Sequence, residues 1–198
     1  MLREREGIQG SSRNDESPMA TASTLTRQLE SHDPDGAGHA QRVTALALRL
    51  AELLRASADR IEAIRAGGPL HDVGKLTIAA AILRKPGPLS PDELEKIRRH
   101  PVVGAHMLHD VEDAQGGLDC VLYHHEWWNG TGYPHGLSRG EIPLEARILA
   151  VADAYDAMTF DRPYRSARSR DEALAEVERC SGTQFDPRIA EALITLET

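Results

Sequence analysis

The stretch HAQRVTALALRLAELLRA, residues His39–Ala56, decides the fold class of this chain. Its apolar residues recur at spacings of three and four positions, which is the period of an α-helix that buries one face. The residues of that face are Val43, Leu46, Ala47, Leu50, Leu53 and Leu54. We therefore predict an amphipathic helix here, and the same period recurs along most of the chain.

Further helices are indicated mainly by their start signals. Ser90 and Ser169 each precede a Glu at the third helical position, which is the pattern of a capping box. Other helices are predicted from about Asp59 to Gly67, over Leu118–Glu126, over Pro143–Phe160 and after Asp186. Because no run of the sequence alternates in the manner of a strand, we predict an all-α fold, a single helical bundle.

Length and charge limit the domain organisation and the partners. A chain of 198 residues fits one domain of ordinary size. Residues 1–21 are polar without apolar periodicity, so we predict a flexible tail followed by one domain over residues 22–198. The net charge of −8 offers no basic surface for a nucleic acid polymer. No apolar run approaches the roughly 20 residues of a membrane span, and the N-terminus lacks a secretory signal, so we expect a cytoplasmic protein.

The chain is rich in histidine, with nine histidines, and this enrichment points to metal ligation. Cys120 and Cys180 form no CxxC pair, which excludes a thiolate metal cluster and a disulfide framework. Metal ligation in this chain would therefore use imidazole and carboxylate groups. These donors suit Fe, Mn or Zn better than Ca.

The segment HDVGK, residues 71–75, carries the first group of candidate residues. His71 and Asp72 are adjacent, and they can serve one site if the Asp72 carboxylate bridges two metal ions through its two oxygens. The ammonium group of Lys75 would then hold a phosphate oxygen. The alternative interpretation is an exposed turn of ordinary polar residues.

The segment HHEWWNGTGYP, residues 124–134, carries the second group. If the predicted helix continues to Glu126, the side chains of His124 and His125 project about 100° apart. They would serve two neighbouring metal ions, or one metal ion and a phosphate. The glycines allow a tight turn from which Tyr133 can present its ring to a nucleobase. The alternative is a solvated helix end.

A third group follows in the helix Pro143–Phe160 and directly after it. Asp153 lies among apolar residues, where a carboxylate is costly unless it is paired or bound to a metal. Arg162 and Arg165 suit a clamp on phosphate oxygens, with a solvated basic turn as the alternative. Two further candidate ligands are His39, at a helix start, and His100, in a predicted turn.

Together these motifs resemble the HD-GYP subgroup of the HD metal-dependent phosphohydrolases. HDVGK, HHEWWNGTGYP, ADAYDAMT and DRPYR occur in this order, and the similarity runs from about Asp33 to the C-terminus. The resemblance implies a helical HD domain with a metal centre in its core that holds two or three divalent ions, Fe or Mn. The implied activity is hydrolysis of the bacterial signalling molecule cyclic di-GMP to pGpG, GMP or both.

The resemblance also implies roles for individual residues. Asp72 would bridge two ions and Lys75 would lie beside the substrate phosphate, so that both act in catalysis together with His71. Asn129 stands where the family usually has Asp, and we expect the loop to keep its geometry because Asn retains an acceptor oxygen. The implied metal ligands are His39, His71, Asp72, His100, His124, His125 and Asp153, with Asp35 as a further candidate, and the implied contacts to the cyclic dinucleotide are Tyr133, Arg162 and Arg165.

Two other functions stay open beside this one. The first is hydrolysis of another nucleotide by the same kind of site. The second is binding of cyclic di-GMP or of a protein, with little turnover, although the complete set of ligand positions favours an active enzyme. Because the segment before the domain is too short for a receiver domain, we expect regulation from a separate regulatory or diguanylate-cyclase protein, from the tail or from a homodimer.

Overall fold

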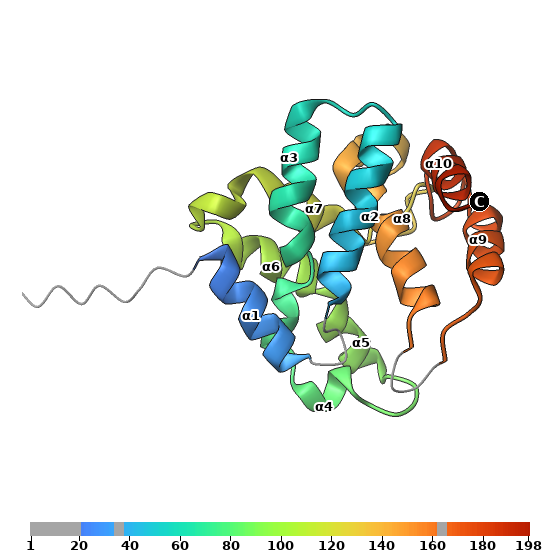
Figure 1. The fold of residues 1–198 in the computed structure, drawn as a ribbon. Helices are drawn as coiled ribbons and strands as arrows, with labels where there is room; N and C mark the ends of the chain where they lie inside the picture. Colours follow the sequence, from blue (N-terminus) through green and yellow to red (C-terminus); the bar gives the residue numbers. More distant parts are fainter. Residues whose placement is uncertain (1–20, 34–37, 162–165) are drawn as a thin grey trace, which may run out of the picture.

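The computed structural model describes residues 21–33, 38–161 and 166–198. The predicted flexible tail lies outside these residues except for Thr21, which caps the first helix. Within the described ranges every regular element is helical, and the strand-type pairings are two isolated bridges. The prediction of an all-α fold is confirmed (Figure 1).

The helices follow one another along the chain, and residues 124–143 form a long connection between α7 and α8 (Figure 1). The α-helices of the described residues are α1 (Ala22–His32), α2 (His39–Leu53), α3 (Ala58–Gly67), α4 (Ala80–Leu83), α5 (Pro91–Arg98), α6 (His100–Leu108), α7 (Leu118–Tyr123), α8 (Leu144–Thr159), α9 (Arg170–Arg179) and α10 (Pro187–Glu197). The 3-10 helices are η2 (Gly68–Leu70), η3 (Val73–Thr77), η4 (Glu112–Gly117) and η5 (Arg139–Glu141).

Helices α2 and α8 lie side by side at the centre of the bundle, with α9 and α10 on one flank (Figure 1). Their main core includes Val43, Leu50, Ile148, Leu149 and Leu193, all fully buried. A second, smaller core lies between α1, α6 and α7. Each buried Leu or Ile contributes about 1.5–3 kcal/mol to folding, so this packing fixes α2 and α8 firmly against each other. These two helices carry the predicted ligands His39 and Asp153.

Several local predictions are confirmed. The predicted amphipathic helix is α2, although it ends at Leu53, three residues before the predicted end. Both capping boxes form, because Ser90 accepts a hydrogen bond from the backbone N–H of Glu93 and Ser169 accepts one from that of Glu172. These caps set where α5 and α9 begin.

Two local predictions are wrong. The helix predicted over Leu118–Glu126 ends three residues earlier, at Tyr123, and His124 after it bonds through Nδ1 to the carbonyl oxygen of Val121. His100 starts helix α6 instead of lying in a turn. Pro101 is compatible with that position, since the first helical turn leaves its backbone N–H groups without intrahelical partners.

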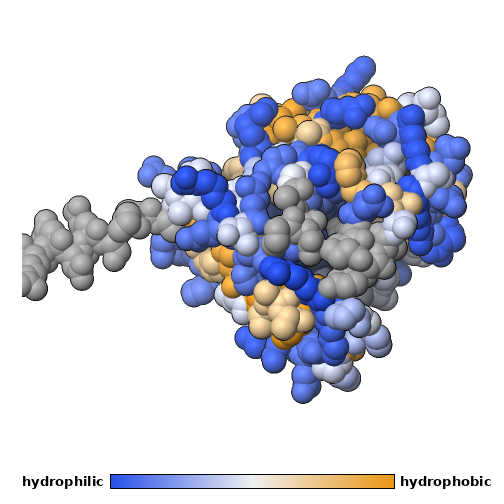
Figure 2. Space-filling view, turned by 60° about the horizontal axis from the view of Figure 1, so that its bottom comes forward, coloured by the Kyte–Doolittle hydropathy of each residue, from blue (hydrophilic) through white to orange (hydrophobic). Residues whose placement is uncertain are grey.

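The face shown in Figure 2 carries both hydrophilic and hydrophobic areas. Most of that face is hydrophilic, and hydrophobic atoms gather in separate patches. Among the described residues, no helix combines the length and the apolar character that a membrane crossing requires.

Candidate metal centre

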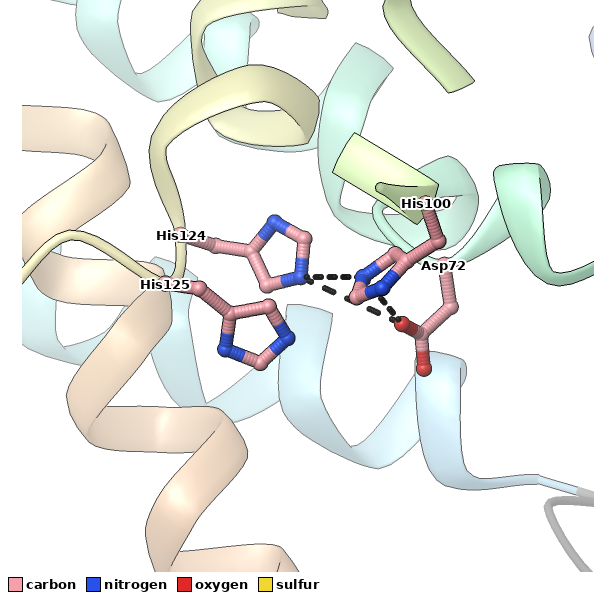
Figure 3. A group of neighbouring side chains, drawn as sticks. All are labelled: Asp72, His100, His124 and His125. Atoms are coloured by element: carbon pink, nitrogen blue, oxygen red, sulfur yellow. Dashed lines mark hydrogen bonds and ion pairs between the residues drawn. The ribbon is translucent and has the colours of Figure 1, made fainter. Parts of the chain in front are cut away.

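The predicted ligands converge on one carboxylate, that of Asp72. Asp72 belongs to two groups of side chains whose ligand atoms lie within 4.8 Å of one another. Figure 3 shows His124 and His125, from the segment after α7, beside His100 and Asp72. The first group is Asp72, His100, His124 and His125, and the second is His39, His71 and Asp72. The two oxygens of Asp72 therefore lie between two neighbouring sets of imidazoles.

The HDVGK segment reaches this position by packing tightly against α6. His71 is 0% exposed and Asp72 is 8% exposed, so the alternative interpretation as an exposed turn is wrong. Gly74 is required here, because a Cβ atom at this position would lie 2.0 Å from the carbonyl oxygen of His100. The close approach of the two backbones leaves Nε2 of His100 3.2 Å from Oδ1 of Asp72.

Three imidazoles are held in the same way, by the carbonyl group three residues earlier in the chain. The distances from Nδ1 to the carbonyl oxygen are 2.7 Å for His71, 2.8 Å for His100 and 2.9 Å for His124. Because a carbonyl oxygen only accepts, each Nδ1 carries the proton and each Nε2 presents a lone pair. Metal-ligating histidines are typically oriented by such a bond from the other ring nitrogen.

His71 tests whether this cluster fits a metal ion. Its Nε2 is buried without a hydrogen-bond partner within the described part of the chain. The atom lies 3.5 Å from Oδ2 of Asp72, but an imidazole lone pair and a carboxylate oxygen are both acceptors. An unsatisfied buried polar atom costs about 1–3 kcal/mol, which a cation between the two acceptors would remove. Imidazole and carboxylate donors without thiolate fit a divalent transition metal.

His39 is held by carboxylates from α8. Its Nδ1 lies 2.6 Å from Oδ2 of Asp156, and its Nε2 lies 3.1 Å from Oδ1 of Asp153. Asp156 also accepts hydrogen bonds from Nε and Nη2 of Arg42, at 2.7 Å and 3.0 Å. The predicted ligand Asp153 thus lies at the cluster beside His39. Sequence reasoning missed Asp156, although its spacing of three residues from Asp153 places both on one helix face.

Electrostatics keeps most of the imidazoles neutral. Burial lowers the pKa of His71, and burial together with the neighbouring His125 holds the pKa of His124 well below its usual value. Burial also lowers the pKa of His125 to about 4. These three rings are uncharged at pH 7, which is the form that binds a metal ion.

In contrast to these three rings, His39 has a raised pKa, because two carboxylates lie beside it. Burial lowers its pKa, but the hydrogen bonds with Asp153 and Asp156 outweigh this effect and raise it to about 9. For Asp72, burial raises the pKa, but the nearby Lys75 and His71 outweigh it and hold the pKa well below its usual range. The shared carboxylate is therefore ionised at every pH near neutrality.

The paired histidines lie in the turn that follows α7. The centroids of their two rings lie 4.1 Å from each other. His124 is 2% exposed, so the alternative of a solvated helix end is wrong. The ring of Tyr133 stacks on His125 with centroids 4.8 Å apart. The loop approaches this closely because Gly132 has no Cβ, which would lie 2.5 Å from the carbonyl oxygen of His125.

Glu126 fixes the loop that carries Tyr133, a role that sequence reasoning missed. Its carboxylate is 3% exposed and accepts three backbone N–H groups of residues 135–137, at 2.6, 3.1 and 3.1 Å. The available signal was an acidic residue directly before a glycine-rich loop. Asn129 accepts hydrogen bonds from the backbone and side chain of Thr131, as expected for a loop that keeps a turn-forming acceptor.

The remaining predicted residues fall in two sets. Lys75 reaches the cluster, with Nζ 2.6 Å from Oδ2 of Asp72. Asp35, Arg162 and Arg165 lie outside the described residues. A cavity of about 210 Å³ opens beside the second ligand group, between α1, α2 and the end of α8, and its lining includes His39, Asp72, Lys75 and Phe160.

The protein is thus a helical domain with a candidate metal site in its core, where imidazoles surround one shared carboxylate. The family model described as "HD domain" matches residues 23–189. The chain therefore belongs to the HD domain family, as the HDVGK motif predicts.

Similar proteins extend this result. The chain is 41% identical over 176 residues to the cyclic di-GMP phosphodiesterase response regulator RpfG of Xanthomonas campestris, covering 88% of this chain and 47% of that protein. It is 40% identical over 173 residues to a cyclic di-GMP phosphodiesterase of Thermotoga maritima, covering 86% of this chain and 46% of that protein. The chain thus spans about half the length of these curated relatives.

The fold also resembles solved structures. A cyclic GMP-AMP specific phosphodiesterase of Vibrio cholerae matches with a TM-score of 0.68 and 20% identity, over 87% of this chain and 46% of that one. At this level of identity the likeness concerns the fold alone, and it confirms the helical HD architecture.

Proposed function

We propose that this chain is a metal-dependent phosphodiesterase that hydrolyses cyclic di-GMP to pGpG, GMP or both. The observation that carries the proposal is the position of Asp72 in both ligand groups, which suits two adjacent ions. The names of the relatives from Xanthomonas and Thermotoga support cyclic di-GMP as the substrate. HDVGK and the GYP turn, the motifs of the predicted family, line the same cluster.

The proposed ligands divide between two ions that share Asp72, and Fe or Mn suits their donors. Bound ions would supply Lewis-acid polarisation of the phosphoryl oxygens and a lowered pKa for coordinated water. Asp35 is the proposed ligand for a third ion. His39, His71 and Asp153 would hold one ion and His100, His124 and His125 the other.

The chain's own residues would complete the site. Lys75 lies 2.6 Å from Asp72 and brings a positive charge to the place where a phosphate oxygen would bind. Tyr133 borders the His125 side of the cluster with its ring. Arg162 and Arg165 are proposed to bind the substrate phosphates.

The test measures metal content and turnover on one anaerobic preparation reconstituted with Mn(II) or Fe(II). We expect two or three ions per chain and the appearance of pGpG or GMP. Asp72→Ala should remove bound metal and lower turnover at least about 100-fold while the helical fold remains. The control is Asp110→Asn, an acid with a 95% exposed side chain outside the cluster. Equal turnover in the Asp72 variant would refute the mechanism.

Cyclic GMP-AMP is the second candidate substrate, because a relative from Vibrio cholerae that is 38% identical over 83% of this chain is named a 3'3'-cGAMP-specific phosphodiesterase. Comparing kcat/KM for the two cyclic dinucleotides on the same preparation decides between them. Bound metal and bound cyclic di-GMP without turnover of either would instead identify a binding module. A cytoplasmic location and regulation through a separate regulatory or diguanylate-cyclase protein, or through a homodimer, belong to the same proposal.

A further inference from the structure

The residue after α8 presents an aromatic ring beside the cavity. Phe160 is 45% exposed and directly follows Thr159, the last residue of the helix. A single exposed apolar residue is ordinary on a protein surface. Phe160 differs because its ring lines the cavity that also contains His39 and Asp72. The cavity therefore combines an aromatic surface with the polar cluster.

Arg42 supports this ring from one side. The central guanidinium carbon lies 3.6 Å from the centroid of the Phe160 ring, which is a close cation–π contact. The guanidinium is itself fixed, because Asp156 accepts hydrogen bonds from its Nε and Nη2. The Phe160 ring therefore packs against a guanidinium group whose orientation is fixed. A ligand that binds here meets a surface that is already ordered, which lowers the cost of binding.

The same Asp156 connects the ring to the metal-ligand cluster. Its Oδ2 accepts from Nδ1 of His39 at 2.6 Å, so one carboxylate separates Arg42 from a proposed ligand. A nucleotide bound through its phosphate at the cluster has its sugar and base in the adjoining space. In this structure the adjoining space is the cavity bordered by Phe160.

We propose that Phe160, backed by Arg42, is a stacking subsite for one purine base of the cyclic dinucleotide. The inference rests on the proposed function, since it assigns a binding surface within the same site. Stacking of a base on an aromatic ring is sequence-tolerant and changes affinity by about 5- to 150-fold. Phe160 would therefore contribute to substrate affinity more than to the choice among purines.

The experiment compares wild type with Phe160→Trp, Phe160→Leu and Phe160→Ser, using the cyclic dinucleotide that the wild type hydrolyses fastest. Stacking predicts that KM rises about 10-fold in the Ser variant and less in the Leu variant, while the Trp variant keeps the wild-type KM. The matched control is Leu53→Ser, which removes a similarly exposed apolar side chain (46%) from the far end of α2. Its KM should equal that of the wild type.

A second readout is independent of turnover. A cyclic dinucleotide that carries 2-aminopurine should lose fluorescence on binding to the wild type and lose much less on binding to the Ser variant. An unchanged KM and equal quenching in the Ser variant would overturn the stacking subsite while leaving the phosphodiesterase intact. A Leu variant that matches the wild type in both KM and quenching would also overturn the stacking subsite, because the size of the side chain and not its aromatic ring would then determine binding. A wild type that neither binds nor hydrolyses any cyclic dinucleotide would refute the proposed function and this inference together.

Discussion

Nε2 of His100 lies 3.3 Å from Nε2 of His124 (Figure 3). Each ring has its Nδ1 on a backbone carbonyl, so in the neutral form both Nε2 atoms present lone pairs to each other. Two facing lone pairs repel unless a cation lies between them. The folded backbone therefore holds these imidazoles in an arrangement that a metal ion would stabilise.

The first prediction follows from this contact. Mn(II) at about 100 times its Kd should stabilise the fold by about 2.7 kcal/mol, which raises Tm by about 5–10 °C for a chain of this size. A chelator should reverse the shift. His124→Gln should show a smaller rise in Tm with Mn(II). The control is His109→Gln, which changes a 75% exposed side chain outside the cluster and should show the full rise in Tm. The same Tm in Mn(II) and in chelator would contradict this prediction.

The second prediction concerns Asp156 as a positioning residue. Asp156→Asn keeps the size of the side chain but removes the charge that orients His39 and Arg42. We expect metal affinity to fall by about 10- to 100-fold, the usual effect of losing a partner behind a ligand. Titration of the metal-free protein, followed by calorimetry, measures the change.

Asp186→Asn is the matched control for Asp156. Asp186 is equally buried, at 4%, and accepts a hydrogen bond from Nη1 of Arg147 at 2.6 Å, but it lies outside the cluster. This variant should lose stability without losing metal affinity. If both variants weakened metal binding equally, Asp156 would have only a structural role.

The helices could be predicted from the sequence because their signals are local. The apolar period of α2 and the caps at Ser90 and Ser169 involve residues only a few positions apart. The end of α7 could not be predicted in this way. The helix ends one residue before His124, and no local stop signal in the sequence marks that position.

The candidate residues could be singled out from their chemistry, but that they all belong to one site was implied only by the resemblance. His39 and His124 are 85 positions apart in the sequence, and no spacing rule indicates that they approach the same carboxylate. Asp156 and Glu126 were missed for a related reason. Their partners are a distant guanidinium and backbone N–H groups, so the signals that the sequence did carry did not show what these carboxylates bind.

The third prediction concerns the loop that carries Tyr133. Glu126→Gln places an amide among three backbone N–H groups that need acceptors. We expect a loss of about 1–3 kcal/mol in the free energy of unfolding, measured with urea, and a higher KM because Tyr133 is less well held. The control is Glu141→Gln, since Glu141 accepts from Ser138 at the end of the same loop but is exposed. An equal loss in both variants would mean that burial of Glu126 has no special effect.

The fourth prediction is proton release on metal binding. In the metal-free protein His39 has a pKa raised to about 9, so it is protonated at pH 7, whereas His71, His124 and His125 have lowered pKa values. A metal ion that binds Nε2 of His39 must displace this proton. Metal affinity at this position should therefore rise about tenfold per pH unit up to about pH 9 and then level off.

An indicator dye in weakly buffered solution measures the protons released. At pH 7.5 we expect His39 to contribute about one proton per chain to this release, and close to none at pH 10, where His39 is already neutral. His39→Gln should lower the release at pH 7.5 by about one proton per chain, because the proton that the metal ion displaces from His39 is then missing. If that variant released as many protons as the wild type, the charge on His39 would not be the one that metal binding displaces.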